Sequence, residues 1–167
     1  MESQNLTLGQ YFLNAADQYG DEDVLIFPNH RHTYESLQIA AISRGCSFSA
    51  SGVGPGDHVG LLMANCPEFI ECLLGLQLLG AVAVPMNARY KAQELAYVLD
   101  NADIKWVVTH DLVSEYANFG DLLLEAVTAK APERLEGLVM LGNPREGFVG
   151  QSEFEALAES VPQAEML

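Results

Sequence analysis

The sequence is short of positive charge and of cysteine. Eight lysine and arginine residues face 23 aspartate and glutamate residues, giving a formal net charge of -15 over 167 residues. Such a chain repels nucleic-acid backbones and anionic membranes, so we expect neither as a partner. Its three cysteines, Cys46, Cys66 and Cys72, form no C-x-x-C motif and lie in apolar stretches. This pattern is typical of reduced, buried thiols, which favours a cytoplasmic location and excludes a disulfide framework.

The sequence also lacks a secretory leader and a clean membrane span. Its first ten residues, MESQNLTLGQ, contain no basic segment followed by an apolar core, so they do not resemble a signal peptide. The most apolar stretch, 69–86, contains Glu71 and Gln77 and is interrupted by Gly75 and Gly80. We expect this stretch to form a buried helix followed by a buried strand. With 49% hydrophobic and 19% charged residues, a packed soluble domain remains.

Apolar periodicity, helix-capping residues and glycine stops predict an alternation of helices and strands. The expected helices are 8–19, 34–50, 67–79, 91–101, 112–130 and 152–159, with a break near Gly120 as the alternative to one continuous helix over 112–130. The expected strands are 24–27, 31–34, 59–63, 81–85, 105–109 and 135–141. A turn at 28–30 should join the first two strands as a hairpin. The later strands are separated by helices, which predicts right-handed crossovers. The expected fold class is α/β, a three-layer, mostly parallel sheet with helices on both faces, plus a small N-terminal hairpin.

A glycine-rich stretch, SGVGPGDHVG at 51–60, superficially resembles a phosphate-binding loop. A dinucleotide-binding loop follows a strand and opens a helix, whereas this one follows a predicted helix and precedes a predicted strand. We therefore interpret it as a helix end at Gly52 and a tight turn at Pro55 and Gly56.

The best candidate binding residues lie in the sequence NARYK, which contains Asn87, Arg89 and Lys91. This loop should leave the carboxyl end of strand 81–85 and lead into a helix N-terminus, where open parallel sheets collect their ligands. A guanidinium, an ammonium and free backbone N–H groups there suit an anionic ligand such as a phosphate. The alternative is that both cations form surface ion pairs.

The other candidates are weaker. His30 and His32 should lie on one face of a strand, but no third metal ligand is evident, so we predict no metal site. His58 and His110 stand alone at strand ends, which is typical of structural histidines. Cys66 lies at a predicted helix start, where a lowered thiol pKa is a less favoured alternative. The sequence contains no nucleophile elbow and no P-loop lysine, so we assign no catalytic residue.

Six motifs occur in a fixed order: G-V-G-P-G-D, N-C-P-E-F, L-G-A-V-A-V-P, N-A-R-Y, E-L-A-Y-V-L-D and W-V-V-T. In this order and spacing the chain resembles the N-terminal part of the adenylate-forming family, which contains acyl-CoA synthetases, luciferases and peptide-synthetase adenylation domains. The resemblance covers essentially residues 7–110. It implies an ATP-dependent acid:CoA ligase that makes an acyl-adenylate, which has a better leaving group than the free acid, and then transfers the acyl group to CoA.

The resemblance also implies the cofactors and partners. A full-length enzyme would use ATP, Mg²⁺ and CoA with a carboxylic acid, for which a fatty acid is a guess from the breadth of the family. The arginine that matches Arg89 lies near the nucleotide end of CoA, while Asn87 should hold the loop and Tyr90 should pack against the sheet. Arg89, Lys91 and Asn87 are thus the predicted cofactor-binding residues.

Several elements of the family have no counterpart in these 167 residues. They are the phosphate-binding loop ending in Lys, the aromatic-Gly-Thr-Glu segment, the ribose-binding Asp and the small C-terminal domain with its lysine. We therefore expect residues 1–167 to be the N-terminal part of the large adenylation domain, inactive alone and able at most to bind CoA. An exposed apolar surface should promote association. A non-catalytic α/β module that binds CoA or another nucleotide is the alternative, and the misplaced glycines oppose a nicotinamide-dependent enzyme.

Overall fold

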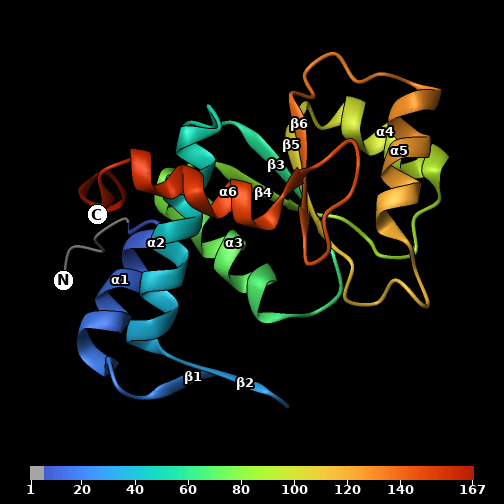
Figure 1. Cartoon of the computed structure of the whole chain (residues 1–167). Helices are drawn as coiled ribbons and strands as arrows, with labels where there is room; N and C mark the ends of the chain where they lie inside the picture. The colour runs from blue at the N-terminus through green and yellow to red at the C-terminus, as the bar shows by residue number, and fades with distance from the viewer. Residues whose placement is uncertain (1–5) are drawn as a thin grey trace.

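The computed structural model describes residues 6–167 (Figure 1). Its helices are α1 (Leu8–Tyr19), α2 (Tyr34–Ala50), α3 (Pro67–Leu79), α4 (Ala92–Asn101), α5 (Phe119–Ala129), α6 (Gln151–Leu157) and the short 3₁₀ helices η1 (Ala158–Ser160) and η2 (Gln163–Met166). Its strands are β1 (Asp23–Phe27), β2 (His30–Thr33), β3 (His58–Leu62), β4 (Val82–Pro85), β5 (Ile104–His110), β6 (Gly137–Leu141) and β7 (Val149–Gly150).

The main sheet has five strands in the order β4-β3-β5-β6-β7, and every neighbouring pair is parallel. Val59 of β3 is paired with Ala83 of β4 on one side and with Trp106 of β5 on the other. Strands β1 and β2 form a separate antiparallel hairpin, with Phe27 opposite His30. The predicted α/β class, the parallel sheet and the N-terminal hairpin are therefore confirmed.

Helices cover both faces of the sheet (Figure 1). Side chains of β3 and β5 alternate between two hydrophobic clusters: Val59 and Val108 belong to the cluster under α3 and α6, and Leu62 and Val107 belong to the cluster under α4 and α5. Because successive side chains of a strand point to opposite faces, strands covered on both sides need continuous apolar runs, and β3 has one. The three layers follow from this pattern.

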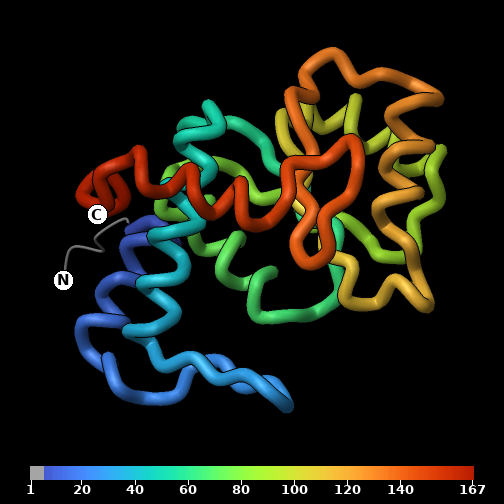
Figure 2. The backbone as a smooth tube through the Cα atoms, in the orientation of Figure 1, coloured from blue at the N-terminus to red at the C-terminus, as the bar shows by residue number. Residues whose placement is uncertain are grey.

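Helices α1 and α2 pack outside α3 and form a further helical layer on that side. The contact between α2 and α3 is close because Gly75 of α3 faces α2: a Cβ at this position would lie 2.7 Å from the carbonyl oxygen of Ala41 and 2.8 Å from the nitrogen of Gly45. The C-terminal segment returns to this layer (Figure 2), where buried Met166 packs with Ile42 and Cys46 of α2. Helix α2 thus packs against both α1 and η2, which are far apart in the sequence.

Local capping explains several element boundaries. Thr7 caps α1, because its side chain accepts a hydrogen bond from the N–H of Gln10. Gly80 ends α3 in the left-handed conformation, with φ of 76°, which glycine adopts at low cost. The turn at 51–57 joins α2 to β3 rather than a strand to a helix, so it is not a dinucleotide loop, as predicted.

Three local predictions need correction. The predicted helix 112–130 begins only at Phe119, because the side chain of Asn118 accepts the N–H of Asp121 and caps α5 there, while 112–116 form turns. The two-residue strand β7 was missed. In α1 the apolar residues Leu8, Tyr11, Phe12 and Ala15 predict one buried face, but Leu8 and Tyr11 are 53% and 66% exposed, whereas Phe12 and Ala16 are buried.

The apolar stretch 69–86 forms α3 and β4, as predicted. Within residues 6–167, none of the helices combines the length and the hydropathy needed to cross a lipid bilayer.

Candidate functional site

The loop 86–91 connects the carboxyl end of β4 to the N-terminus of α4. Asn87 holds its turn, since its side-chain oxygen accepts the N–H of Arg89 at 2.9 Å and its carbonyl accepts the N–H of Tyr90 at 3.0 Å. Tyr90 packs against the cluster under α4 and α5. The roles expected for Asn87 and Tyr90 within the loop thus agree with the structure.

One part of the predicted anion site is corrected. Three N–H groups of the loop are not free, because the carboxylate of Glu94 accepts the N–H of Lys91 at 2.8 Å and Asn87 accepts those of Arg89 and Tyr90. The first-turn carboxylate also offsets the positive end of α4. Attraction for an anion must therefore come from the charged side chains.

Those side chains are unusual among the cations of this chain. Six of the eight lysine and arginine residues form ion pairs, namely Arg31, Arg44, Lys105, Lys130, Arg134 and Arg145. Within residues 6–167, Arg89 and Lys91 form none, and both are exposed. With 23 acidic residues available, two unpaired cations side by side are not a consequence of scarce partners. The alternative that they form surface ion pairs is not realised in the described residues.

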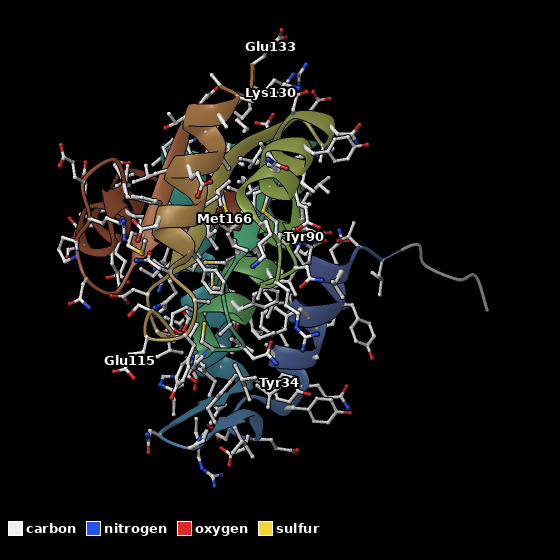
Figure 3. All side chains as sticks on the ribbon, turned by 90° about the vertical axis from the view of Figure 1, so that its right-hand side faces the viewer. Tyr34, Tyr90, Glu115, Lys130, Glu133 and Met166 are labelled. Atoms are coloured by element: carbon white, nitrogen blue, oxygen red, sulfur yellow. The ribbon has the colours of Figure 1, made fainter. Side chains whose placement is uncertain are left out.

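A hollow of about 460 Å³ lies beside the loop. It is lined by 88–91 on one side and by the segment at the start of α5 on the other, including exposed Tyr116 and Asn118. Both segments follow the carboxyl ends of strands, where a parallel sheet places its ligands. Figure 3 turns the side of α4 and α5 toward the viewer and labels Tyr90 near the middle, with Lys130 above it and Glu115 below it.

A second polar group at the same edge was missed by the sequence prediction. Asp111 follows β5, and its carboxylate accepts hydrogen bonds from the backbone and side chain of Asn143, which follows β6. Arg145, from the same loop as Asn143, pairs with Asp121 and donates to Asn118 at 3.1 Å. The rule that selected Arg89, a charge just after a strand, would also have found Asp111 and Arg145.

This second group is acidic rather than anion-binding. Burial is the largest influence on Asp111 and acts to raise its pKa, but hydrogen bonds from Asn143 and the charge of His110 together outweigh it, so the pKa lies below its ordinary value. Asp111 is therefore ionised at neutral pH. A Cβ at position 142 would lie 2.0 Å from an oxygen of Asp111, so the carboxylate packs directly against the backbone of Gly142. The φ of 93° at Gly142 also favours glycine.

The isolated candidates from the sequence prove structural. The Nδ1 of His58 lies 2.7 Å from the carbonyl oxygen of Ala102, and the Nδ1 of His110 accepts the N–H of Leu112 at 3.0 Å. Cys66 is buried at the N-cap of α3, and burial raises its pKa to about 12. An inert thiol results, so the reactive-cysteine alternative is wrong.

His30 and His32 lie close together in β2, as the sequence predicted. Helix α3 places a third group beside them that the sequence could not show: an oxygen of Glu71 lies 3.2 Å from the Nε2 of His32. The spacing of 39 residues between His32 and Glu71 carries no signal in a single sequence.

A further hollow, of about 410 Å³, lies at the amino edge of the sheet, opposite the loop 86–91. Both of its cations are paired: the ammonium of Lys105 lies 2.9 Å from the carboxylate of Asp57, and Arg134 is paired with Asp103. Ligands of open parallel sheets bind at the other edge, so we interpret this hollow as structural.

Comparison with known proteins agrees with this architecture. The family model described as "AMP-binding enzyme" matches residues 12–164. The chain belongs to this family. It is 34% identical over 123 residues to a crotonobetaine/carnitine–CoA ligase of Citrobacter koseri, an alignment that covers 71% of this chain and 23% of that ligase. The motif order had predicted this family, and the prediction is confirmed.

Two solved structures share the fold. The anthranilate CoA ligase AuaEII, solved with anthranoyl-AMP, superposes with a TM-score of 0.78 at 23% identity, over 95% of this chain and 29% of that one. The fatty acyl CoA synthetase of Mycobacterium tuberculosis gives a TM-score of 0.75 at 24% identity, with the same shares of both chains. The chain thus spans less than a third of the length of these proteins.

Proposed function

We propose that this chain forms the N-terminal part of the large domain of an AMP-forming acid:CoA ligase and contributes a phosphate contact for CoA through Arg89 and Lys91. Membership of the AMP-binding enzyme family supports the ligase. The observation that carries the CoA contact is the pair of unpaired cations beside a hollow at the carboxyl edge of the sheet. The whole enzyme would convert a carboxylate to its acyl-adenylate and pass the acyl group to CoA.

The residues of the loop fit a phosphate in three respects. The guanidinium of Arg89 can donate two parallel hydrogen bonds to phosphate oxygens, and the ammonium of Lys91 adds a point charge two residues away. Asn87 fixes the turn between β4 and these side chains, so the loop is ordered before a ligand arrives. Neither cation must break an ion pair to bind, within residues 6–167.

The described residues fit the triphosphate of ATP less well. The carboxyl ends of β5 and β6 present the ionised Asp111, and Arg145 nearby is already held by Asp121. Positioning and neutralising a triphosphate supplies most of the catalysis in nucleotidyl transfer. We therefore propose that the 167-residue polypeptide alone does not form an acyl-adenylate, and that ATP and Mg²⁺ are held by other residues of the whole enzyme.

The proposed inactivity of the 167-residue chain can be tested with acids that its relatives are named for. The relatives are named for crotonobetaine or carnitine, for anthranilate and for a fatty acyl group. An ATP–pyrophosphate exchange assay on the purified chain with one acid of each kind should stay at background. Turnover above background with any of them would overturn the proposed inactivity.

The CoA contact is tested by NMR titration of the 167-residue chain, which also detects weak binding. CoA should shift the backbone amide signals of 87–91, and Arg89→Ala should weaken binding about 10- to 100-fold, because a charge-assisted hydrogen bond contributes about 1.5–3 kcal/mol. The matched control is Arg134→Ala, an exposed arginine at the opposite edge of the sheet.

The titration has three informative outcomes. Equal weakening in both arginine variants would contradict a local site, because it would show only a loss of overall charge. Unchanged affinity in Arg89→Ala would contradict the contact itself. Tight CoA binding that Arg89→Ala abolishes, with exchange at background, would instead favour the non-catalytic CoA-binding module.

A further inference from the structure

Two histidines and a glutamate converge where the hairpin meets α3. The Nε2 atoms of His30 and His32 are 2.9 Å apart, and the Nε2 of His32 is 3.2 Å from the Oε1 of Glu71. One ligating atom from each of the three residues lies within 4.8 Å of the other two. His30 is exposed, whereas His32 and Glu71 are 7% and 8% exposed, so the group has a buried floor and an open side.

The ring of His32 is oriented by Ser36 of α2. The Nδ1 of His32 lies 3.0 Å from the Oγ of Ser36, and that hydroxyl donates to the carbonyl of Thr33 at 3.2 Å. The tautomer of His32 that carries its proton on Nδ1 can donate to this hydroxyl. In that tautomer the lone pair on Nε2 of His32 faces both the Nε2 of His30, 2.9 Å away, and the Oε1 of Glu71, 3.2 Å away, and a cation among these three atoms would bind all of them.

Glu71 is held with one oxygen free for the histidines. Its Oε2 accepts hydrogen bonds from Arg44, whose Nε lies 3.1 Å away, and Arg44 in turn donates to Glu155 at 3.0 Å. Arg44 thus pairs with two carboxylates, Glu71 and Glu155, which leaves a net negative charge beside the two histidine rings. A buried carboxylate is costly unless cations surround it, and a divalent ion at Oε1 would complete its compensation.

We propose that His30, His32 and Glu71 bind a divalent transition-metal ion of the zinc type. Two imidazole nitrogens and a carboxylate oxygen are ligands that suit zinc, and a hydrogen bond donated by the far nitrogen of His32 to Ser36 is the kind of contact that orients metal-bound histidines. Tetrahedral coordination at about 2.0–2.1 Å places ligand atoms roughly 3.3 Å apart. The two adjacent pairs here are 2.9 and 3.2 Å apart and all three atoms lie within 4.8 Å, so rotation of the exposed His30 side chain can complete the geometry. The exposed side beside His30 leaves room for water as a fourth ligand.

The proposed ion would have a structural role. It would join β2 to α3, two elements that are otherwise in contact mainly through α2 and the small cluster of Phe12, Leu37 and Ala41. An ion that binds only the folded chain raises its stability by mass action. The site is independent of the loop 86–91, so it stands or falls separately from the proposed CoA contact.

The test is isothermal titration of the tag-free, EDTA-treated chain with ZnCl₂, paired with thermal unfolding. We expect one ion per chain and, at about 100 times the dissociation constant, a melting temperature higher by roughly 8 °C, since about 2.7 kcal/mol is gained against an unfolding entropy near 0.35 kcal/mol per kelvin. His30→Ala should weaken binding at least about 100-fold without unfolding the chain, because His30 is exposed.

Two further variants complete the design. Ser36→Ala should weaken binding about 10- to 100-fold through loss of ring orientation, while His110→Ala, a histidine outside the group, should bind as the wild type does. Equal affinity of wild type and His30→Ala would overturn the site. Absence of zinc binding to the wild type would overturn it too, and would leave the contact of His32 with Glu71 as a hydrogen bond alone.

Discussion

Replacing Gly75 by alanine tests the close contact of α2 and α3 on which the helical layer depends. The added Cβ would lie 2.7 Å from the carbonyl oxygen of Ala41, 2.8 Å from the nitrogen of Gly45 and 3.0 Å from the Cβ of Arg44. Two of these three atoms belong to backbone, so no side-chain rotation relieves the overlap. The helices must separate by roughly half an ångström or more, which also moves Arg44 relative to Glu71.

The expected magnitude is the difference of two opposing effects. Alanine in a helix interior is about 1 kcal/mol more favourable than glycine, whereas overpacking against backbone costs up to about 3 kcal/mol. We expect a net loss of about 2 kcal/mol in the free energy of unfolding. For a chain of this length the unfolding entropy is roughly 0.35 kcal/mol per kelvin, so the melting temperature should fall by about 6 °C.

Thermal unfolding followed by circular dichroism measures this loss. The matched control is Gly54→Ala, because a Cβ at Gly54 would meet only an oxygen of Asp57 at an ordinary 3.9 Å and the position lies outside the left-handed region. Its melting temperature should stay the same or rise slightly, since alanine reduces the entropy of the unfolded chain. A melting temperature of Gly75→Ala equal to or above that of the wild type would refute the close packing, because only the helix-propensity gain would then remain.

Two more predictions concern ionisable groups. Hydrogen bonds from Lys105, and next from the N–H of Gly54, lower the pKa of Asp57 in the folded chain. The ionised carboxylate therefore stabilises the fold fully above its unfolded pKa of about 3.9, and this stabilisation is lost as the pH falls through the lower folded pKa. Asp57→Asn should cost about 1 kcal/mol at neutral pH and make the decline of unfolding free energy below about pH 4 less steep in urea titrations; an equally steep decline would contradict the pairing. Burial raises the pKa of Cys66 and of Cys72 to about 12, so at pH 8 roughly one thiol in ten thousand is ionised, and a disulfide reagent such as DTNB should react only after denaturation. Rapid reaction of the folded chain would show that the cysteines are accessible.

Much of the fold was predictable because its signals are local. Thr7, Thr33 and Gly80 mark helix ends through hydrogen bonds to near neighbours or through a left-handed φ, and α1 and α2 have the predicted bounds. The helix predicted from 112 starts too early, because the apolar pattern of that stretch continues on both sides of the cap at Asn118, whereas the alternative of a break near Gly120 lies close to the observed start. The helical periodicity there could not distinguish turns from helix.

The sequence by itself determined the candidate loop, because the position of Arg89 and Lys91 after a buried strand follows from chain order and from the rule that ligands gather at the carboxyl ends of parallel strands. The tertiary structure decided which cations lack a partner, since ion pairs such as Arg44 with Glu71 join residues far apart in the chain. It also decided that Glu71 lies beside His30 and His32. The close contact of α2 and α3 at Gly75 sets the distance between these two helices, and so where Glu71 of α3 lies. Contacts of this kind depend on the packing of several elements at once, and a single sequence records the elements but not their packing.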